Sequence, residues 1–498
     1  MRRFWLQLAA AAVFLLALIQ ESSLAPRHDS GTFLIEPPTP YTRYLPTNTP
    51  KGKVLAIHGL DVSREVMSFI SAALADGGFE VYAIDLPGHG ASTVKFQTAL
   101  AEQAIRNVAA KLGADTIVLG HSLGAGLLLD LAANQHFSTM VILSPPPMPI
   151  DEIRADRVLI AAGDIDIPRI RSFVPIAADI GGPHVKTWTL PWAAHSAAIF
   201  NPVYIRRIVE WVGGEAGSTR TLGRIVWLIV MFVAATVLGV HLLLTGNSPP
   251  RRGGEARSAG VVSSAKHSSE LTTPSAPSAH PPLLCEEGNV LILYVAACGT
   301  SLIILKFGNP FGWLRLFGTD YLIGFIFLTG MFLAVAALYE RRSAVIDRSY
   351  GFDRNAVFKS AAAAIYIIFI LGLLVTSHVL HMSLSGSRWW RFPAIVAAGF
   401  PFFASDEWII RTLGSRWRRL GVALLTRGLL LAFLLTGVLI LNRESAFLVL
   451  IVPLITLFWI GLWFAGGLVH KTLRDPFATA LFSALVQGWA FAAWFVIF

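Results

Sequence analysis

Long apolar runs in the second half of the sequence constrain the fold more than any other feature. A helix needs about 20 apolar residues to cross a bilayer, because each residue advances it by about 1.5 Å through a hydrocarbon core of about 30 Å. We predict spans at residues 225–244, 290–305, 321–339, 358–378, 393–410, 421–441, 447–469 and 477–498. The chain should therefore have a transmembrane helix at 225–244 and a transmembrane bundle of about seven helices at 288–498.

The composition agrees with a membrane protein. Hydrophobic residues make up 54% of the 498 residues and charged residues only 14%, whereas a soluble domain carries about 25% charged residues. The net charge of +9 would suggest nucleic acid for a soluble protein, but here most basic residues lie in short loops, where they orient membrane helices. Nucleic-acid binding is therefore disfavoured. Cys285 and Cys298 lie too far apart along a helix to pair, which excludes a disulfide framework.

The N-terminus and the loops predict the orientation in the membrane. Two arginines precede an apolar run, so residues 1–24 should be a signal anchor or a signal peptide, and both would export the next segment. Basic residues concentrate in the loops on the side of the membrane opposite the exported segment. The positive-inside rule makes that side cytoplasmic. We expect a multi-pass protein of the cell's inner (plasma) membrane, with residues 30–214 on the extracytoplasmic side. Residues 246–286, rich in Ser, Pro, Gly and Ala, should form a disordered cytoplasmic linker.

Between residues 30 and 214 the composition changes to that of a soluble domain. Short β-branched runs predict strands at residues 54–57, 81–84, 116–119, 139–143, 158–161 and 185–190. Helical patterns lie between them at residues 64–75, 97–112 and 124–133. This alternation predicts an α/β fold with a mostly parallel sheet and helices on both faces.

A candidate nucleophile follows one of these strands. The motif G-H-S-L-G at residues 120–124 comes directly after the strand at 116–119 and opens a helix. In this setting the turn is tight and strained, and it presents the Oγ atom of Ser122 to a substrate. The helix N-terminus and the backbone N–H of Leu123 would lie beside the carbon under attack.

Two more motifs lead to a family. The segment H-G-L at residues 58–60 ends one strand, and D-L-P-G-H-G-A-S at 85–92 ends the next. With G-H-S-L-G in third place, residues 53–212 resemble the α/β-hydrolase superfamily, and in particular its monoglyceride-lipase and serine-aminopeptidase-like members. The resemblance implies that Ser122 is the nucleophile and that the N–H groups of Leu60 and Leu123 form the oxyanion hole. It also implies Asp166 as the acid and His195 as the base, in the chain order of that fold.

Alternatives exist for two of these assignments. Asp164 lies nearer the strand end than Asp166 and is the alternative acid, whereas His184 is the alternative base although it precedes the last strand. For Asp85 we expect a structural role, because a carboxylate in such a turn accepts backbone N–H bonds. Three motif histidines are expected to pack or hydrogen-bond rather than to catalyse: His58, His89 and His121.

The sequence lacks room for a substrate-covering insertion. Nearby members of the superfamily carry a cap after the strand that corresponds to residues 139–143, but here only residues 144–157 precede the next strand. We therefore expect no cap, and a site that opens to solvent, to the membrane surface or to the transmembrane region. Trp188 and Trp192 near His195 either line an apolar substrate-binding surface or pack against the sheet edge.

Charged residues in the apolar half suggest internal ion pairs rather than a metal site. Asp406, Glu407 and Arg411 lie near one helix end and Arg427 lies inside the next span, where unpaired charges are costly. We predict a salt-bridge cluster. Near the exported face, His378 and His381 lack a third ligand, so we expect no metal there.

Together these features predict a membrane-embedded extracytoplasmic serine hydrolase that uses no cofactor. Its substrates would be lipid-like or acyl esters, as for a lipase or esterase of lipid metabolism, while peptidase, thioesterase or acyltransferase activity stays open. The alternative is a transporter or membrane assembly protein that uses the hydrolase fold as an exported binding or sensor module. A complete set of candidate Ser, Asp and His residues favours the enzyme.

Overall fold

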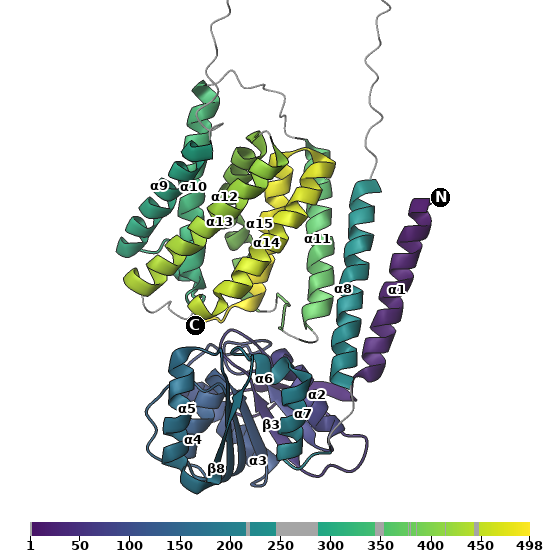
Figure 1. Ribbon diagram of the computed structural model, residues 1–498, viewed down its shortest axis with the longest axis vertical. Coiled ribbons are helices and arrows are strands. Elements are labelled where there is room, and N and C mark those ends of the chain that lie inside the picture. Colours follow the sequence, from purple (N-terminus) through teal and green to yellow (C-terminus); the bar gives the residue numbers. More distant parts are fainter. Residues whose placement is uncertain are drawn as a thin grey trace, which may run out of the picture.

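The computed structural model describes residues 2–215, 220–245, 287–343, 353–376, 378, 380–384, 386–413, 415–442 and 448–498. The predicted linker at 246–286, which includes Cys285, lies outside these residues. The described chain forms a sheet domain and a helical bundle stacked end to end, with the C-terminus between them (Figure 1).

The sheet domain is built on one sheet of eight strands in the order β1-β2-β4-β3-β5-β6-β7-β8. The strands are β1 (His28–Phe33), β2 (Thr39–Tyr44), β3 (Lys53–Ile57), β4 (Glu80–Ile84), β5 (Ile117–His121), β6 (Phe137–Leu143), β7 (Ala155–Gly163) and β8 (Val185–Leu190). Strands β3 to β8 pair in parallel, and β1 and β2 add an antiparallel edge. The six predicted strands are all present, whereas β1 and β2 were not predicted because their sequences are polar.

Helices cover both faces of this sheet, as predicted. One face carries α3 (Thr98–Leu112), α4 (Leu123–Ala132) and α5 (Pro168–Gly181). The other carries η1 (Arg64–Met67), α2 (Ser68–Asp76), α6 (Ala197–Phe200) and α7 (Pro202–Trp211). A short turn, η2 (Gly182–His184), precedes β8. The helix predicted at 64–75 is thus divided into a 3₁₀ turn and an α-helix, and residues 144–154 form an irregular connection between β6 and β7.

The remaining helices form the bundle. They are α1 (Arg2–Leu24), α8 (Arg220–Thr245), α9 (Glu287–Phe307), α10 (Thr319–Ser343), α11 (Arg354–Thr376), α12 (Arg388–Thr412), α13 (Arg416–Thr436), α14 (Leu448–Leu473) and α15 (Pro476–Trp494), with the short turns η4 (Gly312–Leu314) and η5 (Gly437–Leu441). Helix α15 is buried along most of its length against α12, and α1 packs along α8 at one side (Figure 1).

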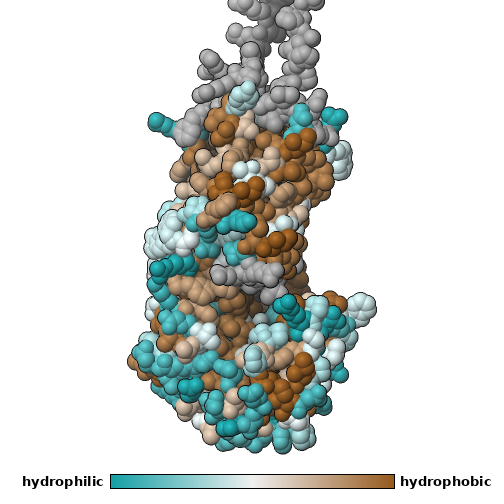
Figure 2. Space-filling model, turned by 90° about the vertical axis from the view of Figure 1, so that its left-hand side faces the viewer, coloured by the Kyte–Doolittle hydropathy of each residue, from teal (hydrophilic) through white to brown (hydrophobic). Residues whose placement is uncertain are grey.

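Eight helices of the described chain are long and apolar enough to cross a membrane, namely all of the long bundle helices except α12. Helix α12 contains the predicted span 393–410 but also carries several charged residues. Large hydrophobic side chains such as Ile229, Phe358 and Phe369 are exposed on the bundle surface. Hydrophilic residues dominate the free end of the sheet domain, and hydrophobic ones gather over the bundle (Figure 2).

The two acidic residues of α12 form ion pairs with arginines inside the bundle, as predicted. The guanidinium of Arg427 makes two bonds to Asp406, at 2.8 Å to Oδ1 and 2.6 Å to Oδ2. The hydroxyl of Tyr294 donates to the same Oδ1 at 2.5 Å. Arg411 pairs with Glu407 one turn away at 2.8 Å. Each buried carboxylate thus has a cationic partner, which offsets its desolvation.

Candidate active site

The candidate nucleophile lies on a strained turn at the carboxyl end of β5. Ser122 has φ +53° and ψ −115°, a conformation that non-glycine residues rarely adopt, and α4 begins at the next residue. Glycines on both sides make the turn possible. A Cβ atom on Gly120 would lie 2.6 Å from the Gly124 backbone, and one on Gly124 would lie 2.7 Å from the His58 carbonyl oxygen. The geometry is that of a nucleophile elbow.

Three of the predicted site residues are joined by hydrogen bonds. His195, in the turn after β8, has Nε2 at 2.9 Å from Ser122 Oγ. Its Nδ1 lies 2.9 Å from Oδ1 of Asp166, in the turn after β7. Because an ionised carboxylate only accepts hydrogen bonds, Nδ1 carries the proton and Nε2 is free to accept one from the serine hydroxyl.

The environment of Asp166 keeps this carboxyl ionised at neutral pH. Burial raises its pKa, but the hydrogen bond and charge of His195, together with hydrogen bonds from Ser144 and the Ile167 N–H, outweigh that effect and hold the pKa below the ordinary value. The backbone N–H of Ile167 also donates to Oδ1, at 2.7 Å. An anionic group at this position can orient an imidazole and stabilise its protonated form.

Two residues fix the backbone of His195 itself. Its carbonyl oxygen lies 3.1 Å from Ser144 Oγ and 3.1 Å from His121 Nε2. Burial and the nearby His195 lower the pKa of His121 to about 3, so this imidazole is neutral and can donate from Nε2. The sequence had suggested a hydrogen-bonding role for His121. It gave no indication for Ser144, whose position after β6 and φ of +50° emerge only in the fold.

The alternative acid and base do not reach this cluster. Oδ1 of Asp164 accepts the Ala193 N–H at 3.0 Å, and the N–H groups of Trp192 and Ala193 lower the Asp164 pKa. Asp164 therefore stabilises the turn that leads to His195. His184 precedes β8, at the opposite end of the strand.

Two backbone N–H groups beside Ser122 have no hydrogen-bond partner within the described residues. They belong to Leu60, which follows β3, and to Leu123, the first residue of α4. A Cβ atom on Gly59 would lie 3.1 Å from Ser122 Cβ, so this loop passes close beside the candidate nucleophile. Free N–H groups in this position could donate to a substrate oxyanion.

The other motif residues hold the loops in place, as predicted. His58 donates from Nδ1 to the Gly59 carbonyl at 2.7 Å and accepts the Leu86 N–H at 3.1 Å through Nε2. Burial lowers the pKa of His58 to about 4, which keeps it neutral. Asp85 accepts the N–H groups of Arg64 and Ala91 at 2.8 and 2.9 Å.

Trp192 is 89% exposed, with φ +54°. This exposure excludes packing against the sheet edge for Trp192, so contact with substrate stays a prediction. Trp188 is partly buried near the side chain of Arg207.

Within the described ranges, no group of three or more His, Cys, Asp or Glu side chains could hold a metal ion.

The edge of the sheet that carries the site faces the helical bundle. Trp494 Nε1 donates to the Asp61 carbonyl at 2.6 Å, in the loop after β3. The Ile497 N–H donates to the Gly88 carbonyl at 3.4 Å, in the loop after β4, and the Ile497 carbonyl accepts the Phe96 N–H at 3.2 Å. The C-terminal segment of the chain therefore lies across these loops (Figure 1).

Comparison with known proteins finds a family that is similar to the sheet domain. Residues 54–262 match the model of the alpha/beta hydrolase family. Similar solved structures include a Paleococcus ferrophilus monoacylglycerol lipase (19% identity, 34% of this chain and 97% of that chain, TM-score 0.31). The carboxylesterase CesB of Bacillus subtilis is similar at 15% identity over 41% and 99% of the two chains, with a TM-score of 0.34. No curated protein matches. Residues 54–262 are thus similar to the alpha/beta hydrolase family.

Proposed function

We propose that this protein is a membrane-embedded serine hydrolase that cleaves ester bonds of lipid-like or acyl substrates. The observation that carries the proposal is the bonded series of Ser122, His195 and Asp166, with a strained serine and a buried carboxylate. A domain used only for binding would not need these three side chains in this order and at these distances.

The proposed reaction is acyl transfer to water. Ser122 Oγ attacks the ester carbonyl while His195 Nε2 takes its proton, and Asp166 stabilises the resulting imidazolium. The N–H groups of Leu60 and Leu123 donate to the oxyanion. His195 then protonates the departing alcohol and activates a water molecule that releases the acid. Each oxyanion-hole donor contributes about 10²- to 10³-fold to turnover in such sites.

We further propose that the bundle spans the inner membrane, with the sheet domain on its extracytoplasmic side. Eight apolar helices of sufficient length support the first part, and the distribution of basic residues in the loops supports the second. Since the site edge faces the bundle, substrates would reach Ser122 from the membrane surface. This placement favours lipid-like esters over large soluble ones.

The test is ester hydrolysis by the full-length protein in detergent micelles or nanodiscs. Acyl esters of increasing chain length should be cleaved by the wild-type protein, and Ser122→Ala and His195→Gln should each lower turnover by roughly 10⁵- to 10⁶-fold, because triad members act as a unit. Ser196→Ala, which changes the next hydroxyl residue after His195, is the matched control and should stay active. Equal turnover of Ser122→Ala and wild type would contradict the proposal.

A further inference from the structure

The loop that carries the Leu60 N–H is bonded to the helical bundle through the next residue. Trp494, the last residue of α15, donates its Nε1–H to the Asp61 carbonyl at 2.6 Å. The Val496 N–H donates to Asp61 Oδ1 at 3.1 Å. Asp61 is only 2% exposed and has φ +54°. The bundle thus binds both the backbone and the side chain of the residue that follows Leu60.

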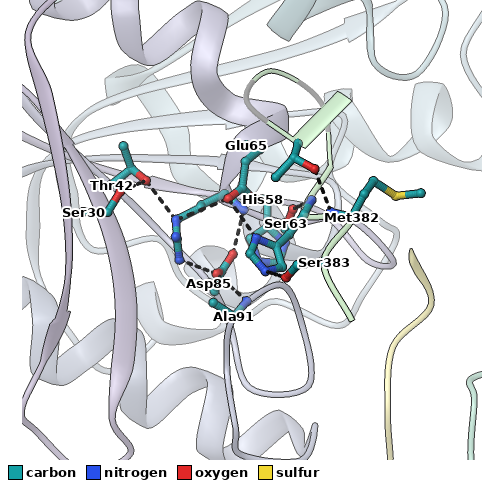
Figure 3. A network of polar contacts seen from close by, with 12 residues as sticks. Ser30, Thr42, His58, Ser63, Glu65, Asp85, Ala91, Met382 and Ser383 are labelled. Carbon is teal, nitrogen blue, oxygen red and sulfur yellow. Dashed lines mark hydrogen bonds and ion pairs between the residues drawn. The ribbon is translucent and has the colours of Figure 1, made fainter. Parts of the chain in front are cut away.

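The same loop is bonded to the bundle a second time, at its other end. The His381 N–H donates to Ser63 Oγ at 2.8 Å, and His381 Nδ1 lies 3.4 Å from Glu65 Oε1. Ser63 and Glu65 lie toward the segment of the bundle that contains Met382 and Ser383 (Figure 3). Contacts with two separate bundle segments, around residues 381 and 494–496, therefore fix this loop.

The C-terminal segment is itself held firmly within the bundle. Arg388 Nη1, from α12, donates to the carbonyl oxygens of Ala492 and Phe495 at 2.9 and 2.8 Å. The Val496 carbonyl accepts the Phe317 N–H at 3.1 Å. Because the residues on both sides of Trp494 are anchored in the bundle, its indole N–H holds the Asp61 carbonyl at a fixed position relative to the bundle.

We infer that Trp494 is a positioning residue for ester hydrolysis, which sets the place of the Leu60 N–H through its hydrogen bond to Asp61. The inference rests on the proposed function. An oxyanion donor must lie about 2.7–3.1 Å from the developing charge, and a shift of about 1 Å at a reacting group can cost 10²-fold in rate. The membrane bundle then completes the active site of the sheet domain by holding one of its two oxyanion donors.

The test compares Trp494→Phe with Trp313→Phe in the full-length protein. Both changes remove an indole N–H that donates to a backbone carbonyl, but Trp313 donates to Pro310 within the bundle. The measured quantities are kcat and KM for an oxygen ester and for the thionoester of the same acid and alcohol. Sulfur is the weaker hydrogen-bond acceptor, so hydrolysis of the thionoester depends less on the oxyanion hole.

Trp494→Phe should lower kcat for the oxygen ester by roughly 10- to 100-fold, with little change in KM and a smaller loss on the thionoester. Trp313→Phe should leave both rates near wild type. Two results would overturn the inference: equal kinetics of Trp494→Phe and Trp313→Phe, or a loss in Trp494→Phe of the same proportion on both substrates. In either case an inactive Ser122→Ala would leave the proposed function standing. If wild type and Ser122→Ala do not differ, the proposed function itself fails.

Discussion

Asp61 carries a buried carboxyl whose ionisation should oppose folding, and replacing it with Asn should remove that effect. Burial raises the pKa of Asp61 from 3.8 to about 7, although the Val496 N–H and the charge of Arg388 act in the opposite direction. Asn keeps the Oδ1 acceptor for Val496 and tolerates a positive φ. Its amide also carries no charge to bury.

The sign follows from proton linkage. Because the folded state binds the Asp61 proton more tightly than the unfolded state, wild-type stability falls as pH rises from about 4 to about 7. The pKa of Asp61 is roughly 3 higher in the folded than in the unfolded state, and each unit of this difference corresponds to about 1.4 kcal/mol. Relative to a neutral residue at this position, Asp61 therefore destabilises the folded protein by ~4 kcal/mol at pH 8 and by ~2 kcal/mol at pH 5. The advantage of Asp61→Asn over wild type should therefore grow by roughly 2–3 kcal/mol between these pH values.

Thermal unfolding of the full-length protein in micelles, followed by tryptophan fluorescence, measures this difference. One kcal/mol corresponds to about 2–4 °C for a domain of this size, so the midpoint advantage of Asp61→Asn should increase by roughly 4–12 °C from pH 5 to pH 8. Asp151→Asn, at an exposed position, should show no such increase. A midpoint difference between Asp61→Asn and wild type that does not change with pH would refute the reasoning.

Asp166→Asn should lower ester turnover by roughly 10⁴-fold, whereas Asp164→Asn should mainly lower thermal stability; the opposite result in turnover assays would move the acid by two residues. Asp406→Ala should lower the thermal midpoint by an amount equivalent to about 3–5 kcal/mol, because it leaves Arg427 buried without its anionic partner. An unchanged midpoint would argue against this pair as a stabilising contact. A single cysteine at exposed Ser172, in a background without the native cysteines, should react with an impermeant maleimide added outside intact cells. Reaction only after lysis would place the sheet domain in the cytoplasm.

Most of the parallel part of the sheet could be predicted because its central strands, β3 to β6, are largely buried on both faces. Residues 54–57 of β3 and 140–143 of β6 are continuous apolar runs, which is the pattern of such strands. Strands β1 and β2 could not be found in this way, because their sequences, H-D-S-G-T-F and T-P-Y-T-R-Y, are mostly polar. Their place is decided by the pairing of β2 with β4 and of β1 with β2, which no local pattern reports.

Some residues of the candidate site could likewise be predicted from the sequence, and others could not. Ser122 follows β5 directly, and Asp166 and His195 lie in the turns after β7 and β8, so that the resemblance to the hydrolase motifs could place them at one edge of the sheet. The partners of Asp61 could not be anticipated, since Trp494 and Val496 lie more than 400 residues further along the chain. Such contacts depend on how the bundle packs against the sheet domain. The Asp406 and Arg427 pair was predictable, because unpaired charges in apolar helices are too costly to persist.

The most direct test of a serine hydrolase with Ser122 as its nucleophile is covalent labelling by a fluorophosphonate, with the modified residue located by peptide mass spectrometry. The wild-type protein should carry one phosphonyl group on Ser122, and Ser122→Ala should carry none while keeping its thermal unfolding midpoint. His195→Gln should label far more slowly, because the serine hydroxyl loses its base. Labelling of Ser122→Ala at the wild-type rate, or absence of labelling in folded wild-type protein, would contradict the account.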